Sequence, residues 1–321
     1  MLALGMENSE RLETDHEKTE FVQRRGSMEA SESCDHKEDV ENQHSEKIKE
    51  LRSKIDVNMD NNVLRQVGRV DDAFLLMFLR ARRYIVDESF KLLSNYIEFR
   101  QNNASLMENL SAWELHHVLE DGLPCVLPYT DQNGAKIIVI FAGSWDKDTY
   151  GTLEILKAFI LTMERLIKTD EAQLNGIKII ADFSGWTASH TSSLSLSFIR
   201  QVFAMFQDRY PARIVAVHFV SEPWYIKAGL TLLKPFIQEK MWKRIHLHGN
   251  NMATLHDHCH LDTLPAEFGG KMPAVNRAYW ARVLVHLEGT KRSHVYGENP
   301  FRRSLSWDTD EQKIPHVIIQ S

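Results

Sequence analysis

The chain has 321 residues, 43% of them hydrophobic, which is enough for one large core with a smaller helical domain beside it. No apolar run approaches the ~20 residues needed to cross a bilayer, and the stretch Met1–Met6 is too short for a signal peptide. Cys34, Cys125 and Cys259 are spaced neither as a disulfide framework nor as metal ligands. We therefore expect a protein of the reducing cytoplasm.

Charge is distributed unevenly along the chain. Residues 1–50 carry 14 Asp/Glu against 7 Lys/Arg, whereas residues 201–250 carry 7 basic residues against 3 acidic ones. Residues 1–42 also contain few large apolar side chains, which predicts a disordered acidic tail, and we expect a second flexible tail over 288–321. Both tails contain Arg-Arg strings before a serine that resemble kinase sites. The absence of a strongly basic domain argues against a nucleic-acid partner.

Helical spacing begins at Ser45. Ile48, Leu51 and Ile55 recur on one face, and Asp71 with its neighbour leads a second helix over 73–82. A third helix is predicted over 87–101. Together these helices predict a small helical domain over residues 43–118.

The next part of the chain alternates strands with helices. Strands over 122–130 and 135–141 form a predicted hairpin closed at Asn133-Gly134. The pattern continues as helix 152–168, strand 176–183, helix 195–209, strand 213–220 and a short strand at 245–249, before a last helix over 275–287. This order predicts an α/β fold whose sheet is largely parallel with right-handed crossovers, a class that usually binds ligands at the strand ends.

The segment between the last two strands is a hinged amphipathic helix. From Trp224 onward it is mostly apolar around a narrow polar stripe of Lys227, Thr231 and Lys234, and Pro235 interrupts it. A second helical piece over 236–244 places three cations on one face, namely Lys240, Lys243 and Arg244. The pattern favours a lid over an apolar pocket that opens against an anionic membrane. The alternative is a packed crossover helix with solvated charges.

No catalytic or nucleotide-binding motif is present. The chain lacks Gly-x-Gly-x-x-Gly after a strand, a phosphate-binding Gly-Lys-Ser/Thr loop and Gly-x-Ser-x-Gly. Asp182 and Glu164 are candidate acids, but no nucleophile lies beside either in the sequence. We therefore expect no enzyme. An apolar cavity is the favoured interpretation, with a solid core of the same residues as the alternative.

His256-Asp-His-Cys-His260 is the one run with metal-ligand residue types. On a helix, His256 and His260 would share a face while His258 would point away. Because nothing nearby supplies the remaining ligands, a surface helix rich in histidine is the favoured interpretation. We expect no metal and no cofactor apart from a bound hydrophobic ligand.

Several longer motifs resemble the CRAL-TRIO lipid-binding family, which includes retinaldehyde-binding and tocopherol-transfer proteins, and within it they are most similar to the clavesins. The resemblance covers Lys47 to Ala281. The motifs that carry it are Asp71-Asp-Ala-Phe, Phe78-Leu-Arg-Ala-Arg82, Asn175-Gly176, Tyr210-Pro-Ala-Arg213, Trp224-Tyr-Ile226, Lys240 to Arg244, His248-Gly-Asn-Asn251 and Leu264-Pro-Ala-Glu-Phe-Gly-Gly270.

The resemblance implies a helical N-terminal domain followed, over 119–287, by a mixed, mostly parallel sheet whose crossover helices enclose one lipid behind a mobile gate helix. The implied pocket lining is Leu156, Phe159, Ile160, Met163, Ile177, Ala181, Leu194, Val202, Met205, Phe206, Tyr210 and Val217. The implied gate consists of Trp224, Tyr225, Leu230, Leu233, Phe236 and Ile237. Relatives bind phosphoinositides with cations that correspond to Arg82, Arg213, Lys240 and Arg244, and Lys243 of the same basic face joins them.

The implied function is non-enzymatic binding and intermembrane transfer of a hydrophobic ligand, with phosphoinositide recognition at endosomal or Golgi membranes. The alternative is a lipid-regulated trafficking adaptor whose acidic tail binds a protein partner. One departure matters, because Val215 stands where the tocopherol-transfer relatives carry another basic residue. The headgroup preference of those relatives therefore does not carry over.

Overall fold

The computed structural model describes residues 42–58, 71–108 and 110–292. Most of the two predicted tails, including Cys34 and the kinase-like strings, lies outside these residues. The flexible tail predicted from residue 288 begins too early, because the last described helix continues to Arg292. Within them, no helix combines the length and the apolar character that a bilayer span requires.

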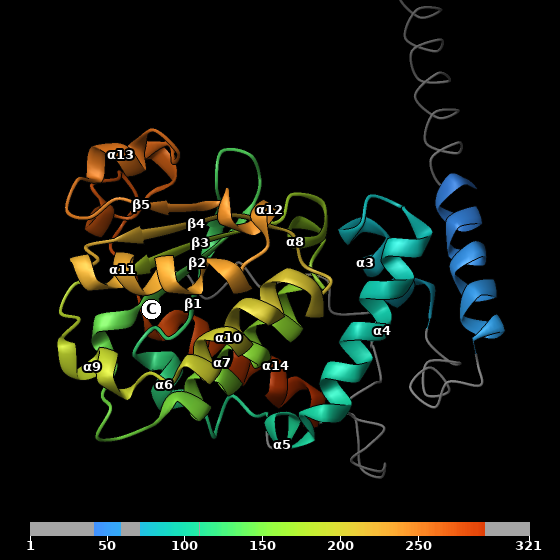
Figure 1. The fold of residues 1–321 in the computed structure, drawn as a ribbon, viewed down its shortest axis with the longest axis horizontal. Helices are drawn as coiled ribbons and strands as arrows, with labels where there is room; N and C mark the ends of the chain where they lie inside the picture. The colour runs from blue at the N-terminus through green and yellow to red at the C-terminus, as the bar shows by residue number, and fades with distance from the viewer. Residues whose placement is uncertain (1–41, 59–70, 109, 293–321) are drawn as a thin grey trace, which may run out of the picture.

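The chain before the sheet is helical, as the sequence predicts. Ile48, Leu51 and Ile55 are all buried, and Asp71 begins α3 by accepting a hydrogen bond from the Phe74 backbone N–H at 2.8 Å. The helices of this part are residues 42–57, α3 (Asp72–Ala81), α4 (Val86–Asn102), α5 (Ala104–Met107) and α6 (His116–Glu120). In Figure 1 the first of them stand at the end of the molecule where strands β2–β5 begin.

The described part of the chain forms a five-stranded sheet in the order β1-β2-β3-β4-β5. Strand β1 is antiparallel to β2, and every later pair is parallel. The predicted hairpin is correct: Gly134 has φ +77° in the turn, and the Asp131 carboxylate accepts from the backbone N–H groups of Asn133 and Ala135. The strands are β1 (Cys125–Thr130), β2 (Lys136–Phe141), β3 (Ile177–Asp182), β4 (Ile214–Val220) and β5 (Ile245–Leu247).

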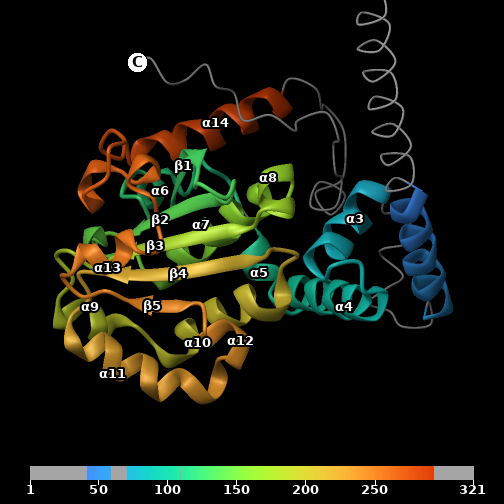
Figure 2. The same ribbon diagram turned by 90° about the horizontal axis from the view of Figure 1, so that it is seen from above.

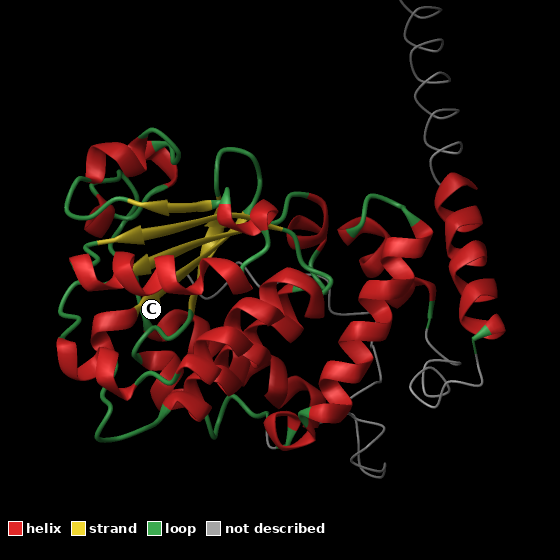
Figure 3. Cartoon of the chain, in the orientation of Figure 1, coloured by secondary structure: helices red, strands yellow, loops and turns green. Residues whose placement is uncertain are grey.

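The crossover helices all lie on one face of the sheet, as Figures 1 and 3 show. Parallel strands that follow one another in both chain and sheet order, joined by right-handed connections, place every connection on the same side. These connections are α7 (Thr152–Leu166) and α8 (Asp170–Leu174), then α9 (Ala188–Ser193), α10 (Leu196–Ala204) and η2 (Met205–Arg209), then α11 (Trp224–Leu233), η3 (Lys234–Phe236) and α12 (Glu239–Trp242).

The opposite face is covered by the chain after β5. This cover contains α13 (Met252–His256), η4 (Leu261–Thr263) and η5 (Ala266–Phe268). Helix α14 (Ala278–Arg292) then lies beside β1, whereas α11 and α12 lie beyond the opposite edge at β5 (Figure 2). The two faces of the sheet thus meet different layers.

Each face has its own hydrophobic cluster, because successive side chains of a strand point to opposite sides. On β2 and β3, Ile138 and Ile179 join the larger cluster with the crossover helices. Their neighbours Val139 and Ile180 join a smaller cluster under Leu255 and its surroundings.

Two helices differ from their predicted form. The predicted helix over 236–244 is wrong in extent: after Pro235 the chain is extended at Ile237, and only α12 follows. Arg244 therefore lies past the helix and does not share a face with Lys240. The predicted helix 195–209 is correct in extent, but its last turn, η2, is a π-helix, a form often found at functional sites.

Candidate functional site

The residues predicted to line a lipid pocket converge on the crossover face of the sheet. They come from α7, β3, β4 and the chain from Leu194 to Tyr210, and all of them except Ala181 belong to or pack against the larger cluster. Leu194, Val202 and Phe206 are only partly buried, while the others are buried. Tyr210 faces the N-terminal helices instead, since its ring packs edge-on against Tyr96.

Helix α10 has an unusual environment for its composition. The structure describes all of its residues, and none is fully buried although most are apolar. Phe198, Ile199, Val202 and Phe203 are each half-buried against the larger cluster. An apolar helix with one side on the core and no fully buried residue leaves hydrocarbon contacts unmade, which suits a wall of a ligand site.

Helix α11 presents apolar side chains to solvent on the adjacent surface. Trp224 is 80% exposed, Leu232 is 78% exposed, and Phe236 in η3 is 51% exposed. The remaining predicted gate residues face inward: Leu230, Leu233 and Ile237 are buried and Tyr225 is half-buried. The polar stripe of Lys227, Thr231 and Lys234 is exposed as predicted.

A second, polar pocket lies on the opposite face of the sheet. Its volume is about 520 Å³. Lys178, Ala216, His218 and His246 contribute to it, and these residues alternate along β3–β5 with the side chains that face the crossover helices. The full lining is Arg83, Asp131, Asn133, Ala135, Asn175, Lys178, Arg213, Val215, Ala216, His218, Arg244, His246 and His258.

Three arginines converge at this pocket. Arg213 precedes β4 and donates to the Leu174 carbonyl at 2.8 Å, and Arg244 precedes β5 and donates to the Ile214 carbonyl. Burial, followed by the nearby charges of Arg213 and Arg83, lowers the pKa of Arg244. Within the described residues, the buried Nε–H of Arg213 has no hydrogen-bond partner. Mutually repelling cations of this kind are typical of an anion site.

The structure places the other predicted cations elsewhere. Lys240 and Lys243 are exposed on α12, and Lys243 pairs with Glu239 at 2.7 Å. Arg82 lies 3.6 Å from Asp208 in η2, and that carboxylate also accepts from Gln238, just before α12. Arg82 thus contacts the end of the gate segment.

Arg83 lines the pocket, whereas the predicted Arg82 does not. The sequence does not predict this position, because the turn after α3 is irregular: Arg83 has φ +52° and Tyr84 has φ +60°. A helical continuation would have pointed these side chains differently. The adjacent arginines in the sequence were the only available signal.

Three imidazoles line the pocket, those of His218, His246 and His258. His218 and His246 are opposite each other across β4 and β5 with ring centroids 5.0 Å apart, and His258 lies 4.2 Å from His246. Burial, followed by the charge of His246, lowers the pKa of His218 to about 2. Burial and the charge of His258 lower the pKa of His248 to about 4.

Among the described residues, one carboxylate lines the pocket, and it is already paired. Asp131 contacts the Lys178 ammonium at 2.7 Å, and both side chains are buried. The pair is neutral as a unit, so the charge that the pocket offers to a ligand comes from the arginines.

The His256–His260 run does not form the predicted helix face. Helix α13 ends at His256, whose Nε2 contacts the Phe268 carbonyl at 2.8 Å. His258 turns toward His246, whereas His260 lies by Asp262. Nowhere in the described ranges do three or more His, Cys, Asp or Glu residues gather in a metal-binding arrangement.

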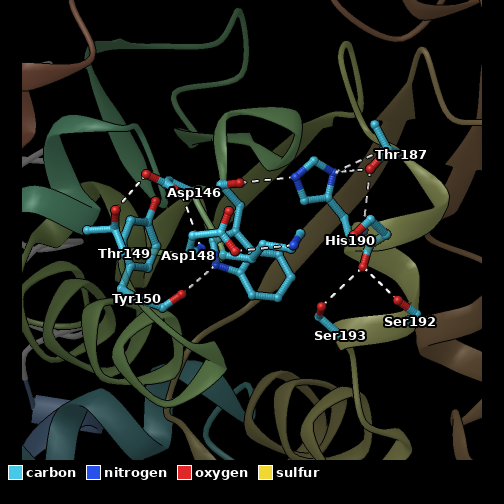
Figure 4. Close-up of polar contacts among 11 residues, drawn as sticks. Asp146, Asp148, Thr149, Tyr150, Thr187, His190, Ser192 and Ser193 are labelled. Atoms are coloured by element: carbon cyan, nitrogen blue, oxygen red, sulfur yellow. Dashed lines mark hydrogen bonds and ion pairs between the residues drawn. The ribbon is translucent and has the colours of Figure 1, made fainter.

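The carboxyl ends of the parallel strands, the usual ligand position, are closed by local contacts. Figure 4 shows His190, from the chain after β3, pointing toward the loop of Asp146 after β2. Its Nε2 lies 3.1 Å from the carbonyl oxygen of Trp145 in that loop. Asp146 accepts from the Thr149 hydroxyl in the same loop. The candidate acid Asp182 accepts the backbone N–H of Ser184 as a turn residue.

The other candidate acid, Glu164, joins α7 to the N-terminal helices. It pairs with Arg100 at 2.5 Å and accepts from the hydroxyls of Tyr96 and Tyr210 at 3.0 and 3.2 Å. All of its contacts are therefore structural ones.

Comparison with known proteins explains this arrangement. The CRAL/TRIO domain family matches residues 120–270. Clavesin-2 of Mus musculus is 40% identical over 276 residues, which cover 85% of this chain and 83% of that protein. Clavesin-1 of Xenopus laevis is 42% identical over 240 residues, covering 74% and 71%. The chain belongs to the CRAL-TRIO lipid-binding family.

The fold of a solved CRAL-TRIO-like protein agrees with this. The crystal structure of Sfh5 superimposes with a TM-score of 0.52 at 16% identity, covering 78% of this chain and 98% of that one. The CRAL/TRIO match contains all of β1–β5 and the gate segment, whereas Arg83 lies outside it. Its last glycine, Gly270, is required by packing, since a Cβ there would lie 1.9 Å from the Leu264 carbonyl oxygen.

Proposed function

We propose that the protein binds a hydrophobic ligand on the crossover face of its sheet and transfers it between membranes without chemical conversion. The half-buried apolar residues of α10 supply one wall, and the exposed Trp224 and Leu232 on α11 supply a surface that enters the bilayer interface. The membranes carry phosphoinositides, on the cytoplasmic side of endosomes or the Golgi, and the headgroup enters the polar pocket.

The observation that carries the proposal is the convergence of Arg83, Arg213 and Arg244 on one pocket without a free carboxylate among its lining residues. Arginine presents a fork of N–H donors that matches phosphate oxygens. The field of an anionic leaflet adds about 1 kcal/mol for each nearby cation. Phosphate binding therefore relieves the repulsion among these side chains.

Headgroup binding is coupled to the gate through neighbouring residues. Arg244 follows the C-terminal end of α12. Arg83 is adjacent to Arg82, which pairs with Asp208. The same carboxylate accepts a hydrogen bond from Gln238, between η3 and α12. Arg200 of α10 lies 3.9 Å from the centroid of the Phe236 ring and so contacts η3 through a cation–π interaction. A phosphate that contacts both Arg83 and Arg244 thus acts on the gate segment at two points, the end of α12 and the Asp208–Gln238 contact.

The test is flotation with liposomes that contain phosphoinositide. Arg213→Ala with Arg244→Ala removes two pocket cations, so we expect a loss of about 2 kcal/mol, or about 30-fold in affinity. Lys271→Ala is the matched control, because Lys271 is an exposed cation paired with Asp262 away from the pocket. Equal binding by the double variant and the control would refute the assignment.

A further inference from the structure

The imidazoles of the polar pocket carry a second inference, which rests on the headgroup site proposed above. We propose that His246 is a titratable wall of the phosphate site, that it contacts the anion together with His258, and that it takes up a proton when the anion binds. The ligand chemistry is a phosphate ester or a free phosphate anion, and its affinity rises as the pH falls.

The geometry sets these two rings apart from the other histidines. His218 is fully engaged, with Nδ1 at 2.9 Å from His248 Nε2 and Nε2 facing the Cys259 thiol at 3.9 Å. His248 Nδ1 faces the Thr254 hydroxyl at 2.8 Å. His246 and His258 line the pocket, and their tilted rings lie with centroids 4.2 Å apart. Their ring nitrogens are the ones placed to meet a ligand.

Most of the charged groups that line the pocket with His246 are cations. Lys178 from β3, Arg213 before β4 and Arg244 before β5 line the same space, as does Arg83 from the turn after α3. Asp131 also lines the pocket, but its charge is held by Lys178 at 2.7 Å. Asp257, next to His258, acts on His248.

Burial, with the charges of His258 and Lys178, accordingly lowers the pKa of His246. An anion in the pocket reverses this balance, because a negative charge within a few ångströms favours the imidazolium form. Binding then takes up a proton, and by linkage the affinity increases as the pH falls toward the pKa of the free group. One proton per ligand limits the gain to about tenfold per pH unit.

The experiment needs a probe whose own charge is constant. A phosphate ester titrates at about pH 6, so inositol hexasulfate is used as the soluble probe and its binding is measured calorimetrically at about pH 7.5 and about pH 6. We expect the wild-type protein to bind about threefold to tenfold more tightly at the lower pH. His246→Gln should flatten this dependence. His116→Gln, an exposed histidine on α6, should leave it unchanged.

A direct readout guards against a variant that fails to fold. In NMR titrations of the wild-type protein, the ring protons of His246 should shift their midpoint to higher pH when the probe is added. The ring protons of His218 and His248 should not. An unmoved midpoint for His246 would overturn the inference.

A comparison of three ligands distinguishes a lipid headgroup from free phosphate, and it separates the histidine proposal from the proposed function. Inorganic phosphate, inositol bisphosphate and phosphoinositide liposomes are compared at both pH values. Equal pH gains for inositol bisphosphate and liposomes support headgroup recognition, and a gain with inorganic phosphate alone would overturn it. Binding that depends on Arg213 and Arg244 but has no pH gain relative to His246→Gln would sink the histidine inference and leave the proposed function intact.

Discussion

The two faces of the sheet use the same strands for opposite purposes. On the crossover face, Ile179 and Val217 meet apolar helices and help to form the larger cluster. On the other face, their neighbours Lys178 and His218 line a polar pocket with three arginines. Alternation along a strand therefore separates an apolar layer from the arginine-lined pocket by the thickness of one sheet.

The crossover face depends on one buried charge, and its loss has the largest expected effect. Glu164→Ala leaves Arg100 without its carboxylate although both side chains are only 12% and 15% exposed. We expect the free energy of unfolding to fall by about 3–5 kcal/mol. Urea denaturation measures this change, with Glu98→Ala on the exposed side of α4 as the control. A loss equal to that of the control would show that the network does not join the helices to the sheet.

The polar face should be the acid-sensitive one. The pKa of His218 is lowered to about 2 and that of His248 to about 4, so both are neutral in the folded protein at pH values where the unfolded chain binds protons. The free energy of unfolding is highest above pH about 6.5, which is the pKa of histidine in the unfolded chain. Below that pH it falls by about 1.4 kcal/mol per pH unit for each of the two histidines. Thermal unfolding between about pH 7 and pH 5 tests this. In the variant His218→Gln the slope should be shallower, and an unchanged slope would contradict the assignment.

The exposed surface of the gate distinguishes membrane insertion from simple packing. Trp224→Ala removes a side chain that is 80% exposed and contacts little of the protein. We expect little change in stability but a loss of about 2 kcal/mol of interfacial binding, or about 30-fold. Flotation with neutral liposomes measures it. The exposed Trp113→Ala, on the N-terminal side of α6, provides a matched control.

The smallest effect is expected for the exposed lysines of α12. Lys240→Ala with Lys243→Ala should weaken phosphoinositide binding by only about 1 kcal/mol, because Lys243 already pairs with Glu239 and both lysines are solvated. This loss should vanish at high salt, whereas the loss caused by Arg244→Ala should persist. The reverse order would move the headgroup site from the pocket to the surface of α12.

The crossover face could be predicted from the sequence far better than the polar face. Hydrophobic periodicity located α7, α10 and the parallel strands, because local pattern and burial agree there. The anion pocket depends instead on residues that precede strands and become neighbours only in the folded sheet, such as Asn175 and Arg213. His258 reaches the pocket from a loop that the sequence suggested was helical.

The gate segment shows the same limit within a single stretch. Its apolar character and the break at Pro235 were predicted, but the basic face was not formed. The extended backbone at Ile237 shortens the second helix and turns Arg244 toward β4. Spacing in the sequence cannot reveal this change of direction.

Crystals of the protein with a water-soluble, short-chain phosphoinositide test the central claim most directly. The account predicts phosphate density within hydrogen-bonding distance of Arg213 and Arg244, on the side of the sheet opposite α7 and α10. A headgroup held by Lys240 and Lys243 on α12, or one found among the crossover helices with the arginine pocket vacant, would contradict it.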